Sequence, residues 1–321
     1  MRDVILETRH VKKYFRTASG MLHAVDDVSF SIERGKTLGV VGESGCGKST
    51  LGRTVLGMID TTDGEVFFEG KDITKANKRE QKLLRRDMQL IFQDPYSSLN
   101  PRKTVFDLIA VPLRVFRVCK GKHELQDRVF QLMDTVGLAR RLANTYPHEL
   151  DGGRRQRVGI ARALALNPKF IVCDEPVSAL DVSIQAQVLN LLQDLQEEKT
   201  LTYIFVTHDL SVVRHISDDI LVMYLGVVVE KSQTKGLFRN PLHPYTKGIL
   251  AAIPVPDIDA PKERALLSGE LTSPIEPNPG CRFFNRCPHS EAICSEKSPS
   301  MEEALPEHFV ACHKVREINS L

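Results

Sequence analysis

The chain has 321 residues, which is enough for one large domain or two ordinary ones. Its 43 lysines and arginines nearly balance its 41 aspartates and glutamates, so no overall electrostatic field favours nucleic acid or an anionic membrane as a partner. The N-terminal sequence MRDVILETRHVKKYF lacks the apolar core of a signal peptide, and no apolar run is long enough to span a bilayer. These features predict a cytoplasmic protein whose partners bind at local sites.

The first informative element is a short apolar run at 36–41, KTLGVV, which predicts a buried strand. It leads into GESGCGKST at 42–50, which matches G-x-x-x-x-G-K-[ST] between a strand and a helix. Glycines in such a loop let backbone N–H groups wrap phosphate oxygens at a helix N-terminus. The alternative is a glycine-rich turn that happens to hold a lysine. The predicted phosphate contacts are Gly42, Ser44, Gly45, Cys46, Gly47, Lys48, Ser49 and Thr50, with Lys48 reaching the β- and γ-phosphates and Ser49 binding Mg²⁺.

Helical periodicity dominates the residues that follow this strand group. The segments TVFDLIAVPLRVF and ELQDRVFQLMDTVGL both carry it, and they predict a helical subdomain at about 94–167, inserted into an α/β core.

Two further buried strands are predicted, FIVCD at 170–174 and TYIFVT at 202–207, with a helix between them. Strand, helix, strand implies a parallel sheet. Asp174 at the end of the first strand suits Mg²⁺ binding, and Glu175 suits polarisation of an attacking water. Adjacent carboxylates on a solvated loop are the alternative. His208 follows the second strand, where it can donate to a γ-phosphate or simply begin a helix.

After Ala252 the sequence becomes proline-rich, which predicts a linker or irregular docking segment instead of a continuing sheet. Four of the seven cysteines lie in this part of the chain, at Cys281, Cys287, Cys294 and Cys312. Few hydrophobic residues separate them, so a metal is expected to organise the segment in place of a core. Zinc usually uses tighter Cys pairs, and a [4Fe–4S] cluster fits the irregular spacing better. Reduced, unligated cysteines are the alternative.

A phosphate loop alone leaves kinases, GTPases and motor ATPases open, but six motifs occur together here. They are GESGCGKST, Gln93 in IFQDP, LDGGRRQR at 150–157, FIVCDEP, SALD at 178–181 and THD at 207–209. In order and spacing they resemble the ATP-binding subunits of ABC transporters over about residues 4–252. The resemblance implies an α/β fold of the P-loop ATPase type with an antiparallel β subdomain, the inserted helical subdomain and, at 253–321, a small irregular extension that carries the cysteines.

The same resemblance implies a role for each matching residue. Each ATP is expected to lie between the phosphate loop of one protomer and the signature loop of another. Tyr14 matches the aromatic residue that stacks on adenine, although a packing role is the alternative for a tyrosine in a strand. Gln93 matches the residue that senses Mg²⁺ and couples to the membrane subunit. The remaining contacts expected with nucleotide or partner protomer come from Asp151, Gly152, Gly153 and Asp181.

Two segments, DPYSSLNP at 94–101 and NPLHPYTKGIL at 240–250, resemble the oligopeptide/dipeptide importer ATPases within this family. That class implies a peripheral subunit at the cytoplasmic face of the cell membrane. Its expected partners are two integral membrane permease subunits, a paralogous ATPase subunit and, indirectly, an extracytoplasmic peptide-binding protein, with no nucleic acid. The cysteine tail recurs in this class, and some members carry a [4Fe–4S] cluster. The rival functions are a soluble, non-transport ABC ATPase and a small-molecule kinase, and the kinase has no use for the signature segment or SALD.

The signature segment departs from the family pattern Leu-Ser-Gly-Gly-Gln, because Asp151 replaces the serine and Arg154 the glutamine. A hydroxyl donates and accepts hydrogen bonds, whereas an ionised carboxylate only accepts. Asp151 is therefore expected to repel the γ-phosphate and to make its composite site degenerate. Arg154 is expected to offset part of the repulsion by pairing with Asp151 or directly with the phosphate. The alternative is that Asp151 turns away as a helix N-cap.

Overall fold

The computed structural model describes residues 3–94, 98–252 and 273–321, and its chain divides into two compact units. Unit 1 combines Met1–Lys75 with Phe205–Leu321, and unit 2 is Ala76–Ile204. Residues 253–272, which contain the proline-rich start of the tail, lie outside the described residues. The domain boundary at residue 252 and the helical range 94–167 stay predictions.

Unit 1 begins with an antiparallel sheet of four strands in the order β2-β1-β4-β5. The long hairpin β1–β2 is fastened by Thr8, whose hydroxyl donates to the carbonyl of Phe30 and accepts from its N–H. This sheet is the antiparallel subdomain that the family resemblance implies. Its strands are β1 (Val4–Thr17), β2 (Gly20–Glu33), β4 (Asp63–Phe68) and β5 (Lys71–Asp72).

A second sheet in unit 1 carries the phosphate loop. Strand β3 (Thr37–Val41) is buried throughout, which confirms the predicted strand, and it pairs in parallel with β9 (Asp219–Tyr224). Strand β10 (Val227–Gln233) continues the sheet antiparallel to β9. The helices of this part are α1 (Lys48–Val55), α8 (Leu210–Ile216), α9 (Thr234–Arg239) and α10 (Pro244–Ala251).

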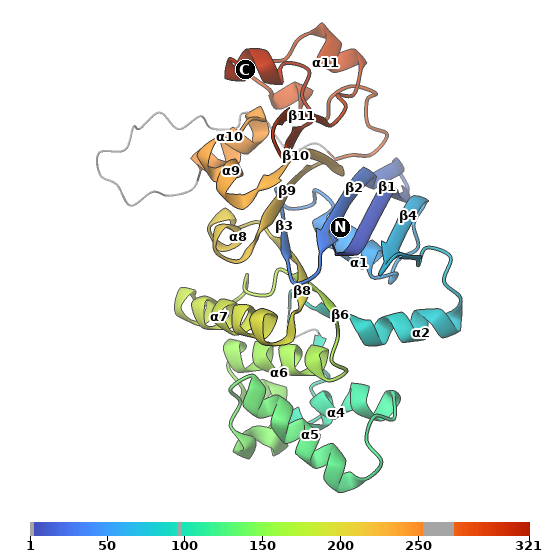
Figure 1. Cartoon of the computed structure of the whole chain (residues 1–321), viewed down its shortest axis with the longest axis vertical. Helices are drawn as coiled ribbons and strands as arrows, with labels where there is room; N and C mark the ends of the chain where they lie inside the picture. The colour runs from blue at the N-terminus through green and yellow to red at the C-terminus, as the bar shows by residue number, and fades with distance from the viewer. Residues whose placement is uncertain (1–2, 95–97, 253–272) are drawn as a thin grey trace. The chain divides into compact units, whose positions relative to one another are not determined.

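The C-terminal extension differs from the sequence prediction, because it does continue the sheet. Strand β12 (His308–Val310) pairs antiparallel with β10, and β11 (Glu302–Leu305) pairs with β12 (Figure 1). An apolar core also organises it: Phe283 lies buried in a cluster with Tyr224 and Tyr245. Strands of three or four residues leave too little periodicity for a sequence pattern to reveal. Short helices complete the extension: η3 (Phe284–Arg286), α11 (Ala292–Glu296) and α12 (Val315–Asn319).

Unit 2 joins a strand pair to a group of helices. Strand β6 (Met88–Ile91) pairs in parallel with β7 (Phe170–Asp174), and β8 (Thr202–Thr207) carries the chain back towards unit 1. Both β7 and β8 are buried along their whole length, as predicted for these apolar runs. Helix α6 contacts α4, α5 and α7 (Figure 1). The helices are α2 (Lys78–Asp87), α4 (Val105–Val115), α5 (Lys122–Thr135), η1 (Arg140–Asn144), η2 (Pro147–Glu149), α6 (Gly152–Leu164) and α7 (Val182–Lys199).

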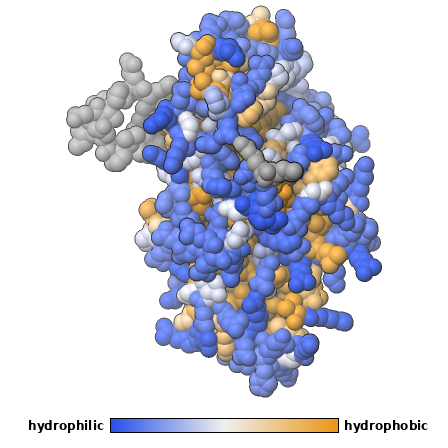
Figure 2. Space-filling view, in the orientation of Figure 1, coloured by the Kyte–Doolittle hydropathy of each residue, from blue (hydrophilic) through white to orange (hydrophobic). Residues whose placement is uncertain are grey.

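Hydrophilic residues predominate on the face of the molecule shown in Figure 2, with apolar residues in scattered patches. Among the described residues, no helix combines the length and the apolar character that crossing a membrane requires.

A buried carboxylate ties the extension to the rest of unit 1. Glu230 on β10 is fully buried and accepts hydrogen bonds from the N–H groups of Leu242 and His243, at 2.8 and 2.9 Å. Its Oε1 also lies 2.6 Å from Nε2 of His308 on β12. His243 caps α10 by accepting from the N–H of Tyr245 through Nδ1. Burial lowers the pKa of His243 to about 4, although the nearby Glu230 carboxylate acts in the opposite direction.

This lowered pKa predicts a loss of stability in mild acid. Above pH 6.5 His243 is neutral in both the folded and the unfolded chain. As the pH falls from 6.5 towards 4, only the unfolded chain takes up the proton, so the free energy of unfolding falls by up to about 3 kcal/mol. His243→Asn keeps a capping acceptor and removes the titration. Urea unfolding between pH 7 and 4.5 should give a flatter pH profile for this variant, and equal slopes for variant and wild type would contradict the assignment.

Candidate functional site

The phosphate loop of unit 1 is formed as its sequence predicts. Lys48 is 5% exposed, and its ammonium donates to the carbonyls of Gly42 and Glu43 at 2.7 and 2.9 Å. The loop ends in Gly47, which precedes α1 with φ of 104°. A Cβ on Gly47 would stand 1.9 Å from the carbonyl oxygen of Ala24, so only glycine fits.

The tip of the loop is open. Ser44 and Gly45 are exposed, and a Cβ built on Gly45 would meet nothing within 4 Å. Cys46 is buried, and burial raises the pKa of its thiol. Ser49 and Thr50 are half-buried in the first turn of α1. The loop therefore offers an exposed backbone tip above a buried ammonium, an arrangement suited to a polyphosphate.

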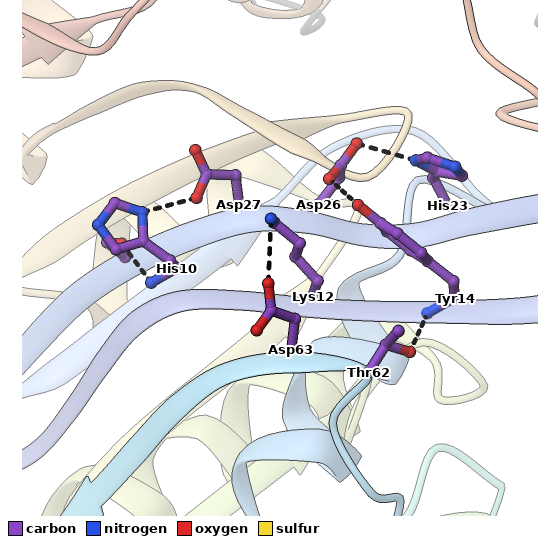
Figure 3. Close-up of polar contacts among 9 residues, drawn as sticks. His10, Lys12, Tyr14, His23, Asp26, Asp27, Thr62 and Asp63 are labelled. Carbon is purple, nitrogen blue, oxygen red and sulfur yellow. Dashed lines mark hydrogen bonds and ion pairs between the residues drawn. The ribbon is translucent and has the colours of Figure 1, made fainter.

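Tyr14 belongs to a polar group on the antiparallel sheet of unit 1 (Figure 3). Its ring stacks on His23 with centroids 3.9 Å apart, so at most one ring face is left for a base. Its hydroxyl donates to Oδ1 of Asp26 at 2.5 Å, and Nδ1 of His23 lies 3.0 Å from Oδ2 of the same carboxylate. Burial is the largest single effect on the Asp26 carboxyl and raises its pKa, but these two hydrogen bonds together with the nearby charges of Arg282 and His23 lower the pKa overall. His23 and Asp26 carried no sequence motif, and the sequence analysis missed them.

The remaining predicted residue of unit 1, His208, is exposed after the end of β8. The next residue, Asp209, caps α8 through a hydrogen bond from the N–H of Ser211. His208 thus precedes a helix, as in the alternative interpretation, and its predicted contact with phosphate stays a prediction.

In unit 2 the two predicted carboxylates differ in environment. Asp174 is 1% exposed at the end of β7, whereas Glu175 is half-buried. Glu175 has φ of 46°, a left-handed conformation that costs a residue other than glycine free energy and is concentrated at functional sites. Its Oε2 accepts a hydrogen bond of 2.8 Å from the amide nitrogen of Gln93, which brings two residues 82 positions apart into contact. The pairing of Gln93 with Glu175 was not visible in the sequence.

The signature segment adopts the geometry of the alternative interpretation of Asp151. Asp151 is the N-cap of α6, and its Oδ1 accepts from the N–H of Arg154 at 2.7 Å. The guanidinium of Arg154 lies 3.4 Å from Oδ2 of Asp151. The two residues that differ from the family motif therefore contact each other. Both side chains are about half exposed, and they border a cavity of about 300 Å³ that Gly153 and Arg157 also line. Gly153 packs closely on α7, because a Cβ there would meet Ile184 at 2.5 Å.

Two other predicted residues also lie at the N-terminal end of a helix. Asp181 is the N-cap of α7 and accepts from the N–H of Ile184 at 3.0 Å, which lowers the pKa of this carboxyl. Gly152 is the first residue of α6. Their contacts with nucleotide or a partner chain stay predictions.

The four C-terminal cysteines come together without forming a ready metal site. The N–H of Cys281 donates to the carbonyl of Cys294 at 2.7 Å. Burial, followed by smaller effects that include the other thiols, raises the pKa of Cys281 to about 11, and burial also raises the pKa values of Cys287 and Cys312. Within residues 3–94, 98–252 and 273–321, however, no three His, Cys, Asp or Glu side chains are arranged to hold one metal ion. The side chains as placed do not fit the predicted [4Fe–4S] cluster or Zn²⁺.

Comparison with known proteins supports the class that this fold and loop define. The profile described as "ABC transporter" matches residues 25–178, and "Oligopeptide/dipeptide transporter, C-terminal region" matches residues 229–294. A solved dimeric ATP-binding cassette bound to ADP and phosphate is 31% identical, with a TM-score of 0.65 over 72% of this chain and 99% of that one. The structure of cbiO1 from Clostridium perfringens is 28% identical, with a TM-score of 0.66 over 74% of this chain and 92% of that one. The chain is an ATP-binding cassette protein.

Full-length relatives identify the family more narrowly. The oligopeptide transport ATP-binding protein AppF of Bacillus subtilis is 51% identical over 97% of this chain and 98% of its own length. The oligopeptide transport ATP-binding protein OppF of Escherichia coli is 50% identical over 98% of this chain and 97% of its own length. The chain therefore belongs to the oligopeptide/dipeptide family of ABC transporter ATP-binding proteins.

Proposed function

We propose that this chain binds MgATP and hydrolyses it to drive import of oligopeptides or dipeptides through a membrane ABC transporter. The observation that carries the proposal is the formed phosphate loop, with buried Lys48 held by the loop carbonyls, in a chain of this family. In the proposed assembly the chain lies at the cytoplasmic face of the membrane. It pairs there with a paralogous ATPase subunit and with two permease subunits that receive peptide from an extracytoplasmic binding protein.

The proposed chemistry assigns separate tasks to the residues of the two units. Lys48 and the loop N–H groups bind the phosphates, Tyr14 packs on adenine, and His208 donates to the γ-phosphate. Glu175 accepts the proton of the water that attacks the γ-phosphorus, and the bond between the γ-phosphorus and the leaving ADP oxygen breaks, which gives ADP and phosphate. Mg²⁺, held by Ser49, Gln93 and Asp174, would neutralise the phosphate charge. Because the amide nitrogen of Gln93 donates to Glu175, its amide oxygen is the atom left for the metal.

Replacing Glu175 by Gln is expected to abolish turnover while leaving nucleotide binding intact. The amide has the same shape but no basic oxygen, so the ATPase rate of the transporter should fall about 100-fold or more. The dissociation constant for ATP should change by less than about threefold, because the carboxylate acts on water and not on the nucleotide. Glu197→Gln is the matched control, because Glu197 is an exposed residue of α7. Turnover near the wild-type rate in Glu175→Gln would remove Glu175 from the catalytic role.

Transport distinguishes this function from the rival, a soluble ABC ATPase without membrane partners. Purification of the chain together with permease subunits, and peptide uptake that depends on it, support the importer. ATP hydrolysis by a chain that never associates with permeases would favour the rival.

We further propose that the composite site completed by Asp151 is weaker than its counterpart in the assembled dimer. The carboxylate places negative charge beside the helix N-terminus that would face phosphate, and Arg154 offsets part of that charge. Asp151→Ser should therefore raise the ATPase rate of the assembled transporter by about tenfold or less. Arg154→Gln alone should lower the rate, because it leaves the carboxylate uncompensated. An unchanged rate in Asp151→Ser would instead support capping as the whole role of this residue.

The cysteines carry a separate proposal, a [4Fe–4S] cluster with Zn²⁺ as the alternative occupant. Its support is the presence of four cysteines, up to 31 positions apart, in a family tail, and binding requires their side chains to rearrange, because as placed in the described residues they form no metal-binding group. Anaerobically purified protein should then contain iron and absorb visible light, and Cys287→Ala should lose both while Cys119→Ala keeps both. Colourless protein that contains stoichiometric zinc would show that Zn²⁺ is the occupant. Protein whose cysteines bind no metal would exclude both the cluster and Zn²⁺.

A further inference from the structure

The segment CRFFNRC at 281–287 contains two arginines, Arg282 and Arg286, which form ion pairs with Asp26 and with Glu43 of the phosphate loop. Arg286 has a side chain only 6% exposed, and its two terminal nitrogens donate to the two carboxylate oxygens of Glu43 at 2.7 and 3.1 Å. Such a bidentate pair fixes orientation as well as distance. The hydrogen bond to Glu43 raises the pKa of Arg286, so the guanidinium is charged at any pH at which the protein folds.

Glu43 is the second residue of the phosphate loop, and all of its polar groups are engaged. Its N–H donates to the hydroxyl of Tyr245 at 2.9 Å, and its carbonyl accepts from the ammonium of Lys48 at 2.9 Å. Arg286 therefore binds the side chain of Glu43, and the main-chain carbonyl of Glu43 binds Lys48. Through Glu43 the lysine is linked to a residue 238 positions later in the chain.

Arg282 makes a corresponding ion pair with Asp26 on the antiparallel sheet. One of its terminal nitrogens donates to Oδ2 of Asp26 at 2.5 Å, and this carboxylate also binds Tyr14 and His23. The N–H of Asp26 donates to the carbonyl of Gly226, whose own N–H donates to the carbonyl of Cys46 in the phosphate loop. The stacked rings and the loop are therefore joined through main-chain hydrogen bonds, with Arg282 at one end.

We propose that Arg282 and Arg286 are positioning residues for nucleotide: Arg286 orients Lys48 through Glu43, and Arg282 orients the Tyr14–His23 pair through Asp26. This inference rests on the proposed ATP binding at the same loop. The cysteine-bearing extension is then part of the nucleotide site, although neither arginine contacts the nucleotide. The alternative is a structural role, in which the two ion pairs only attach the extension to the rest of unit 1.

The two roles predict different ligand dependences. Arg286→Gln should weaken binding of both ATP and inorganic tripolyphosphate by about tenfold, because both ligands use Lys48. Arg282→Gln should weaken ATP by about tenfold and change tripolyphosphate by less than about twofold, because tripolyphosphate has no base to stack on Tyr14. Titration calorimetry on the full-length chain measures both constants. In the assembled transporter the KM for ATP should rise in each variant while kcat stays within about twofold.

A double-mutant cycle tests whether Arg286 acts through Glu43. Glu43→Gln alone should weaken both ligands as Arg286→Gln does, and the double variant should be no weaker than either single variant. Arg286→Lys should recover part of the affinity, because it keeps the charge and loses the bidentate contact. Arg316→Gln, an exposed arginine of the same extension, is the matched control and should leave both constants unchanged.

Thermal unfolding of each variant separates positioning from a general loss of structure. Variants that unfold at lower temperature but bind both ligands with wild-type affinity would establish the fastening role and overturn the inference. Equal losses for ATP and tripolyphosphate in Arg282→Gln would overturn the assignment of Arg282. If the wild-type chain itself binds no nucleotide, the proposed function is overturned together with this inference. Results on the variants alone bear only on the inference and not on the proposed function.

Discussion

The two ends of the phosphate loop, at Gly42 and Gly47, have no room for a side chain, and the position of the loop in unit 1 depends on that constraint. A Cβ on Gly42 would come within 2.2 Å of the carbonyl oxygen of Met223, and one on Gly47 within 1.9 Å of that of Ala24. The backbones of β2 and β9 therefore lie close against these two glycines. Two carbonyls of the loop accept hydrogen bonds from the ammonium of Lys48 and so fix its position. The tip of the loop, at Ser44 and Gly45, is exposed. Binding to such a preformed loop avoids most of the cost of ordering it.

Three carboxylates connect this frame to the C-terminal extension in the same manner. Asp26 accepts from Arg282, Glu43 accepts from Arg286, and Glu230 lies beside His308. The carboxylates of Asp26 and Glu230 also accept hydrogen bonds from other groups of unit 1, whereas both oxygens of the Glu43 carboxylate accept from Arg286. A shielded charge with several hydrogen bonds is costly to leave unpaired, which gives these contacts more weight than exposed ion pairs have. The extension is thereby attached by specific polar contacts as well as by Phe283 and its aromatic neighbours.

Sequence patterns predicted the parts of the fold that local spacing encodes. The strands at 37–41, 170–174 and 202–207, the helix that follows GESGCGKST and the loop itself all appear where expected. The contact of Asp151 with Arg154 joins residues three positions apart and was anticipated. The pairs Gln93–Glu175 and Glu43–Arg286 were not, because no periodicity relates residues 82 or 243 positions apart. The extension was judged from its prolines and cysteines, and that composition concealed two short strands and an aromatic core.

The distance along the chain between Glu43 and Arg286 also has a consequence for biosynthesis. The ribosome produces the phosphate loop 243 residues before it produces the arginine that holds it. At synthesis rates of about 5–20 residues per second, the nascent chain spends on the order of 10 to 50 seconds with Glu43 lacking this partner. The Glu43 side chain gains this partner only after residue 286 has been synthesised. A truncated product that ends before residue 281 would contain every cassette motif and still have an incompletely supported lysine.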